Sequence, residues 1–175
     1  MKPVLSAICC LALCAMPALS QKKAAKTAGA GAAMSDQQFV DFAAQTDMVE
    51  ANLGQMAQSQ GDSQAVKDFG QMLVTDHTND FNQLYTVAQQ ANLNRPNSIG
   101  AEQNKAMIDP FQKLKGAAFD KKFGHEMVAG HTKANAIYTK EAADAQNDAL
   151  KTYAQTALPV LQKHLDSAKS LEKAK

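Results

Sequence analysis

Apolar side chains recur at steps of three and four residues along most of the chain, which is the spacing of one face of an α-helix. The first such segment begins at Ser35, where Gln38 completes a capping-box pattern. A second is capped by Asp62 or Ser63 and ends near Ala91. We therefore predict two long helices joined by a tight turn. Their predicted buried faces contain Phe39, Phe42, Thr46, Val49, Leu53 and Met56 in the first helix and Val66, Phe69, Leu73, His77, Phe81, Leu84 and Ala88 in the second.

The same spacing returns after a connector that spans residues 92–116 and carries a shorter helical pattern, interrupted at Pro110. A third long helix is predicted for residues 117–145, and a fourth is capped by Asn147 or Asp148. No segment alternates with a period of two, so the sequence predicts no strands. The predicted buried faces contain Phe119, Phe123, Met127, His131, Ala134 and Tyr138 in the third helix and Leu150, Tyr153, Ala157, Leu161, His164, Ala168 and Leu171 in the fourth.

Two long helix pairs joined by a connector of about 25 residues predict an all-α, ferritin-like four-helix bundle. We expect this domain to span residues 35–173, with a short extra helix in the connector between helices 2 and 3. Pro159 falls inside the fourth helix, where it removes one backbone donor. We expect a kink there, about one turn before His164, that frees the carbonyl of Gln155.

The first 20 residues predict a secretory signal peptide. Lys2 gives a positive start, and the apolar run of residues 4–15 is too short to cross a bilayer. Ala18 and Ser20 place small residues at positions −3 and −1 of a cleavage site before Gln21. We therefore expect a periplasmic protein, exported across the inner membrane.

A lipoprotein is the alternative, because Cys14 lies at the end of the apolar run. Leu13 is bulky for the residue before a lipidated cysteine, which favours simple cleavage. All three cysteines lie in the predicted signal peptide, so the mature chain has no thiol for a disulfide, a nucleophile or a metal ligand. Residues 21–34 are rich in Ala, Gly and Lys and predict a flexible tether.

The charge balance excludes one class of partner. The chain has 18 Lys and Arg against 17 Asp and Glu, and loss of Lys2 with the signal peptide leaves 17 against 17. A neutral chain without tryptophan offers neither a basic face nor the aromatic side chains that stack on bases, so we expect no nucleic-acid partner. No segment of the mature chain has about 18 consecutive apolar residues, so we expect no transmembrane segment.

Three histidines are the candidates for chemistry. His77, His131 and His164 lie on the predicted buried faces of three different helices, each about 15–18 residues from a hairpin turn. Because each residue of a helix adds about 1.5 Å, the three side chains agree in height within about one turn. We therefore expect three imidazoles to meet inside the bundle.

A metal site with these three imidazoles and one carboxylate is one interpretation, with zinc, iron or copper as the ion. Glu50 is the first candidate for the carboxylate, and Asp47 or Asp80 could replace it, although Asp47 is expected to point further from the core. The other interpretation is three separate core histidines, each hydrogen-bonded to its own partner. The sequence leaves both open.

A dinuclear iron centre of the ferritin type does not fit the sequence. Such a centre needs Glu-x-x-His on two helices, whereas Val74, Val128 and Leu161 lie three residues before the three histidines. His125 is followed by Glu126 but points away from the predicted buried face, so we expect it to be solvated.

The chain resembles a family of exported bacterial proteins of unknown function with a ferritin-like four-helix fold, some of which are labelled predicted outer-membrane proteins. The resemblance covers about residues 35–172 and is carried by residues 50–54, by residues 66–69 leading to Asp76-His77, by Phe119-Asp120 leading to His131, and above all by residues 158–165, LPVLQKHL. It implies a periplasmic bundle in which Glu50, His77, His131 and His164 are recurring polar core positions. It implies no reaction.

Taken together, these features predict a non-enzymatic envelope or stress protein that binds a transition metal through core histidines, with an envelope protein as its partner. A metal-dependent oxidase or peroxide-consuming bundle is the alternative from the enzyme class. A structural module that docks a partner is the third.

Overall fold

The computed structural model describes residues 34–173. The signal peptide expected for residues 1–20 and the tether expected for residues 21–34 lie outside the described part of the chain, apart from Met34. Within that part the chain is all-α. Its elements are α1 (Asp36–Gln60), α2 (Gln64–Gln90), α3 (Ala101–Gln103), the π-helical turn η1 (Asn104–Ile108), the 3₁₀ turn η2 (Asp109–Phe111), α4 (Gly116–Asp144) and α5 (Asp148–Lys173).

The helix starts follow from local side-chain chemistry. Ser35 and Gln38 form the predicted capping box, in which each side chain accepts a hydrogen bond from the backbone N–H of the other residue. Ser63 caps α2 by accepting from the N–H of Val66. The Asn147 side chain accepts from two N–H groups in the first turn of α5. These caps confirm the predicted helix starts to within a residue or two.

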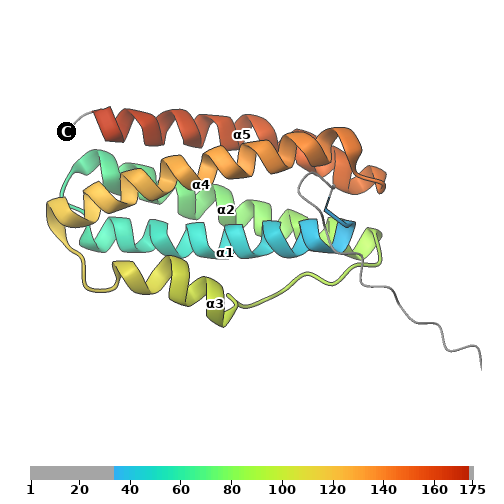
Figure 1. The fold of residues 1–175 in the computed structure, drawn as a ribbon, viewed down its shortest axis with the longest axis horizontal. Helices are drawn as coiled ribbons and strands as arrows, with labels where there is room; N and C mark the ends of the chain where they lie inside the picture. Colours follow the sequence, from blue (N-terminus) through green and yellow to red (C-terminus); the bar gives the residue numbers. More distant parts are fainter. Residues whose placement is uncertain (1–33, 174–175) are drawn as a thin grey trace, which may run out of the picture. The chain divides into compact units, whose positions relative to one another are not determined.

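The long helices form two hairpins, α1 with α2 and α4 with α5, which pack on each other through α2 against α5 and α1 against α4. Between the hairpins the connector runs back along the bundle, so that α2 and α4 point the same way (Figure 1). This arrangement confirms the predicted all-α architecture with bundle-like packing. The short extra helix in the connector is also confirmed, as α3 and the two turns that follow it.

The core consists of two apolar clusters with the three histidines between them along the helices. On α2, for example, His77 lies between Leu73 of one cluster and Leu84 of the other. On α5, His164 lies between Leu161 and Ala168 in the same way. The bundle therefore buries a polar layer near the middle of its length, enclosed by apolar side chains on both sides.

The predicted buried face of α1 is partly wrong. Phe42, Thr46 and Met56 are only half-buried, whereas residues predicted to lie beside the face are enclosed. The buried face is wider than a single stripe because α1 packs against α2, α4 and η1 at once. The buried residues of α1 are Phe39, Val40, Ala43, Ala44, Asp47, Val49, Glu50, Leu53, Gly54 and Ala57.

Two glycines let α1 and α2 approach each other closely. A Cβ atom at Gly54 would lie 2.6 Å from the carbonyl oxygen of Gly70, and a Cβ atom at Gly70 would lie 2.6 Å from the carbonyl oxygen of Gly54. No side chain fits at either position without moving a helix. This contact sets the distance between the two helices that carry Asp47 and His77.

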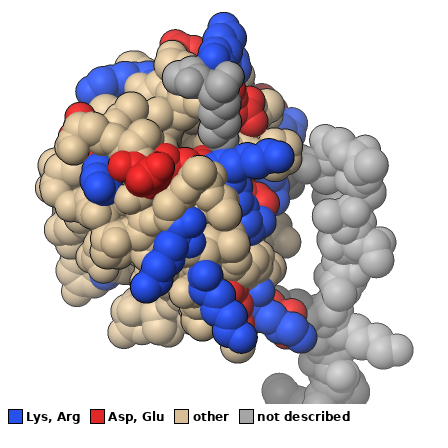
Figure 2. All heavy atoms as spheres, turned by 90° about the vertical axis from the view of Figure 1, so that its left-hand side faces the viewer, with Lys and Arg blue, Asp and Glu red and all other residues tan. Residues whose placement is uncertain are grey.

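Figure 2 shows the end of the bundle where α1 turns into α2. Acidic and basic side chains are interspersed on this surface, which is otherwise uncharged. Tyr85 and Val160 are the large apolar side chains most exposed among the described residues. In residues 34–173 no helix combines the length and the apolar character that a membrane crossing requires.

Candidate metal centre

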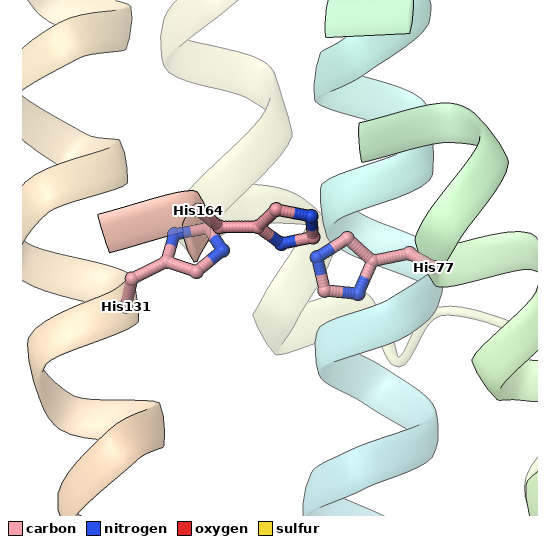
Figure 3. A group of neighbouring side chains, drawn as sticks. All are labelled: His77, His131 and His164. Carbon is pink, nitrogen blue, oxygen red and sulfur yellow. The ribbon is translucent and has the colours of Figure 1, made fainter. Parts of the chain in front are cut away.

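His77 from α2, His131 from α4 and His164 from α5 point toward one another inside the bundle (Figure 3). The ring centres are 5.9 Å apart for His77 and His131, and 5.2 Å apart for each of the other two pairs. One ring nitrogen from each histidine lies within 4.8 Å of those of the other two. All three side chains are buried. The convergence expected from the helix heights is thereby confirmed.

Each histidine has one ring nitrogen in a hydrogen bond. Nδ1 of His77 is 2.9 Å from Oδ1 of Asp47, Nδ1 of His131 is 2.9 Å from the carbonyl oxygen of Met127, and Nε2 of His164 is 2.9 Å from Oδ2 of Asp76. Carbonyl and carboxylate oxygens accept hydrogen bonds, so these three nitrogens carry the protons. The donor nitrogens fix the tautomers of the neutral rings.

The opposite nitrogens, Nε2 of His77, Nε2 of His131 and Nδ1 of His164, are buried and have no hydrogen-bond partner. In the neutral rings these atoms carry the lone pairs, because the protons are on the other side. A histidine that binds a metal through one ring nitrogen usually donates a hydrogen bond from the other nitrogen to a carboxylate or carbonyl oxygen. The triad thus presents three lone pairs inside one buried cluster.

Burial keeps two of the rings neutral. Desolvation, reinforced by the nearby His77, lowers the pKa of His164 from 6.5 to about 4, although the hydrogen bond with Asp76 opposes it. Desolvation also lowers the pKa of His131, against the opposing charge of Glu50. At neutral pH both imidazoles are therefore unprotonated on the nitrogen that a metal would need.

His77 differs because it lies against Asp47. Burial alone would lower the pKa of His77, but the hydrogen bond with Asp47 and the negative charges of Asp47, Glu50 and Asp80 outweigh it and raise that pKa. Burial likewise raises the pKa of Asp47, from 3.8 to about 7, against the hydrogen bond from His77. Near neutral pH the pair therefore holds one proton more than the Nδ1–H that Asp47 accepts, and a cation at Nε2 would have to displace that additional proton.

The carboxylates proposed to join the triad lie in different surroundings. Glu50 is buried, with 6% of its surface exposed, and its Oε2 atom has no partner. Its negative charge acts to raise the pKa of both His77 and His131. However, the donor atoms that lie within 4.8 Å of one another belong to the three histidines and do not include Glu50. Glu50 as a direct ligand therefore stays a prediction. Asp80 accepts a 2.6 Å hydrogen bond from the hydroxyl of Tyr153, and it is close enough to the triad for its charge to raise the pKa of His77.

Two aspartates form hydrogen bonds with the triad that the sequence does not predict. Asp47 was expected to point away from the core, but it is buried against His77 because the buried face of α1 extends toward α2. Asp76 was not singled out, although it directly precedes His77. Neighbouring residues on a helix point about 100° apart, so Asp76 reaches toward α5 and His164 while His77 faces the core.

The donor set fits a transition metal. Metal–nitrogen distances of about 2.0–2.1 Å place tetrahedral ligand atoms about 3.4 Å apart. The three nitrogens lie within 4.8 Å of one another, so a shift of less than about 1 Å by each ring closes the site. Imidazole without thiolate suits zinc, copper and iron alike.

Two cavities flank the triad. One, of about 220 Å³, lies between α2 and α5 and is bounded by His77 and His164 together with Asp76, Asp80, Tyr153 and Val160. The other, of about 560 Å³, lies between α1, the connector and α4, and has Glu50 in its wall. The first cavity reaches two of the three histidines, and the second reaches Glu50.

Two further sequence predictions concern residues near the centre. The His125 side chain is 76% exposed, and its Nδ1 atom lies 3.3 Å from Oε1 of Glu172. This confirms that His125 is solvated and separate from the triad. Pro159 lies inside α5, which runs from Asp148 to Lys173. The kink expected at Pro159 stays a prediction.

A family model described as "Domain of unknown function (DUF4142)" matches residues 21–171. No curated protein and no solved structure matches the chain.

Proposed function

Because this chain belongs to the DUF4142 family, whose function is not known, we propose a function from its own residues: it binds one transition-metal ion through His77, His131 and His164. The observation that carries the proposal is the set of three buried, unpartnered ring nitrogens, one from each histidine. Their opposite nitrogens are held by Asp47, the Met127 carbonyl and Asp76.

The energetics favour a ligand over three separate core histidines. A buried polar atom without a partner costs about 1–3 kcal/mol, and the triad contains three such atoms side by side. Leucine would fill the same space without that cost. A metal ion satisfies all three nitrogens at once, so it accounts for imidazoles at positions where apolar residues would give a more stable bundle.

The charges around the triad suit a divalent cation. Asp47 and Asp76 accept the outer N–H groups of two ligands and make the imidazoles better donors. Glu50 adds a buried carboxylate close enough to affect two of the rings. We propose that it balances the charge of the ion and serves as the fourth ligand when the triad closes.

One ion is favoured over two. A dinuclear carboxylate site uses Glu-x-x-His on two helices, whereas Val74, Val128 and Leu161 occupy the positions where those glutamates would stand. The ion is therefore proposed to be mononuclear, and zinc, iron and copper are the candidates.

The fold and location complete the proposal. One long crossover between two helix hairpins is the connection found in ferritin-like bundles, so we place this domain among them. The signal peptide expected at the N-terminus supports export to the periplasm. There the protein acts as a non-enzymatic metal-binding protein of the envelope or of its stress response, with an envelope protein as partner.

One observation favours an enzymatic alternative. The cavity between α2 and α5 reaches His77 and His164, and its wall contains Tyr153 hydrogen-bonded to Asp80. A redox metal with a free position on this side could consume oxygen or peroxide. This alternative requires iron or copper together with turnover, and metal binding alone does not support it.

Metal content and calorimetry test the proposal. The mature protein is purified without affinity tags that bind metal, analysed for zinc, iron and copper, and then titrated with each ion after chelation. We expect close to one ion per chain, with binding abolished in His77→Ala, His131→Ala and His164→Ala. His125→Ala is the matched control, because His125 is exposed on α4 and outside the triad.

Three results decide between the candidates. Equal binding by His125→Ala and the wild type, with loss in all three triad variants, supports the site. A wild-type protein that takes up none of the three ions overturns it. Consumption of oxygen or peroxide by the iron or copper form, lost in the triad variants, establishes the enzymatic alternative.

A further inference from the structure

The cavity between α1, the connector and α4 has the size and shape of a small-molecule site. Its volume of about 560 Å³ falls within the range of ligand pockets. Phe42, Val49 and Met107 give it apolar walls. It is separate from the cavity between α2 and α5, with which it shares no lining residue.

A buried carboxylate lies in the inner wall of this cavity. Glu50 is more than nine-tenths buried, and its Oε2 atom has no hydrogen-bond partner. Gly130 on α4 lets the carboxylate approach closely, since a Cβ atom there would lie 3.3 Å from Oε1 of Glu50. An unpaired buried carboxylate next to open space calls for a ligand that donates hydrogen bonds and carries positive charge.

The outer part of the cavity is negatively charged, like Glu50 in its inner wall. Asp41 and Glu102 line it together with Glu50, against the single cation Lys133. The Lys133 ammonium lies 5.7 Å from the centre of the Phe42 ring, in cation–π contact. Three carboxylates against one ammonium favour an organic cation over an anion.

The part of the connector that covers the cavity has an unusual turn and is anchored to α1. Ala106 and Met107 reach it from η1, a π-helical turn of a kind that is rare and occurs often at functional sites. Gln45 on α1 holds the start of the connector, because its side chain donates to the carbonyl of Ser98 and accepts from the N–H of Gly100. The wall formed by the connector is thus fixed to α1.

We infer that this cavity binds a small organic cation, with its ammonium group on Glu50 and its apolar part against Phe42, Val49 and Met107. The inference goes beyond metal binding. It shares Glu50 with the proposed metal site, but the three histidines proposed to hold the metal are not in the cavity wall. Primary alkylamines are the simplest members of this ligand class.

Calorimetry and methyl NMR with n-hexylammonium test the inference on the purified mature protein. Hexanoate and 1-hexanol are the controls, since they keep the chain and change the charge. We expect saturable binding of n-hexylammonium that shifts the methyl signals of Ala106 and Met107, with weaker binding of both controls. Glu50→Gln should weaken binding about tenfold or more, because it removes a charge-assisted hydrogen bond.

A second variant keeps the test valid if Glu50→Gln does not fold. Ala106→Phe places a ring in the cavity from an exposed position on the connector, and it should block binding. Thr156→Phe, which lies at the other cavity, is the matched control and should bind as the wild type does.

The inference is overturned if n-hexylammonium does not bind, if hexanoate or hexanol binds equally well, or if Ala106→Phe leaves binding unchanged. The metal content of the same samples is measured in parallel. A protein that takes up none of the three metal ions on titration, yet still binds n-hexylammonium through Glu50, would refute the proposed metal site and leave this inference standing.

Discussion

His77 and Asp47 form a 2.9 Å hydrogen bond in the interior of the bundle, with both side chains buried. They come from the two helices of one hairpin, α2 and α1, which are held close together by the contact between Gly54 and Gly70. Asp47 orients the ring so that Nε2 of His77 faces the other two histidines. The carboxylate therefore prepares the ligand without needing to contact the ion.

Replacement of Asp47 by Asn should weaken metal binding by about ten- to hundredfold, because the outer partner of a ligating histidine sets both its orientation and its basicity. Asp76→Asn should have a smaller effect, since Asp76 is 30% exposed and water can replace its hydrogen bond to His164. Competition against a chromophoric chelator measures both affinities. Wild-type affinity in Asp47→Asn would mean that His77 needs no orienting partner.

Replacement of His131 by Leu should separate stability from function. The metal-free variant should be more stable than the wild type by about 1–2 kcal/mol, because a buried nitrogen without a partner is replaced by an apolar group. The stabilisation that added metal gives the wild type should disappear. Urea unfolding with chelator and with metal provides both values. A metal-free variant less stable than the wild type would show that His131 has a structural role of its own.

The stability of the metal-free protein should depend on pH through His164. Its pKa is lowered from 6.5 to about 4, so between these values the unfolded chain binds more protons than the native one, and stability falls as the pH falls. Asp47 acts in the opposite direction, because its pKa is raised to about 7 and the native state gains protons there on acidification.

A comparison with His164→Gln isolates the first effect. Between pH 7 and pH 4, the stability of the wild type should fall relative to the variant by about 3 kcal/mol, which is the free energy that corresponds to the lowered pKa. Denaturant unfolding of both proteins at four pH values, in chelator, measures the difference. A difference that does not change with pH would contradict the neutral state assigned to His164.

Replacement of Gly70 by Ala should destabilise the bundle by about 1–3 kcal/mol, although alanine favours helices, because its Cβ would lie 2.6 Å from the carbonyl oxygen of Gly54. Ala129→Gly, at an exposed position of α4, measures the difference in helix propensity between alanine and glycine. This gives the stabilisation that Gly70→Ala would gain from propensity alone. Thermal unfolding compares the two. An increase in the melting temperature of Gly70→Ala would mean that the helices separate at little cost.

The sequence was sufficient for the parts of the site that depend on helix periodicity. His77, His131 and His164 each follow an apolar stripe at three- and four-residue steps, and residue counts from the turns gave their common height. The contacts of Asp47 and Asp76 with the histidines depend on how α1 and α2 are rotated about their axes, which the apolar pattern does not define. The polar buried residues of α1, Asp47 and Glu50, contact neighbours that the sequence of α1 alone cannot identify.

The connector shows a second limit of the sequence. The sequence predicts its short helix but not the π-helical turn at Asn104–Ile108, because five residues are too few to show a period different from that of an α-helix. The cavity that it covers also depends on the path of the connector across α1, which hydrogen bonds of Gln45 and Gln37 hold in place. Such long-range contacts leave no periodic signal.

The ligands come from both halves of the bundle, since His77 belongs to the first hairpin and His131 and His164 to the second. A bound ion would act as a removable cross-link between the hairpins, in a part of the chain that has no cysteine to form a disulfide. Protease cutting within residues 92–100 would then leave two fragments that stay together while the ion is present and separate when a chelator removes it.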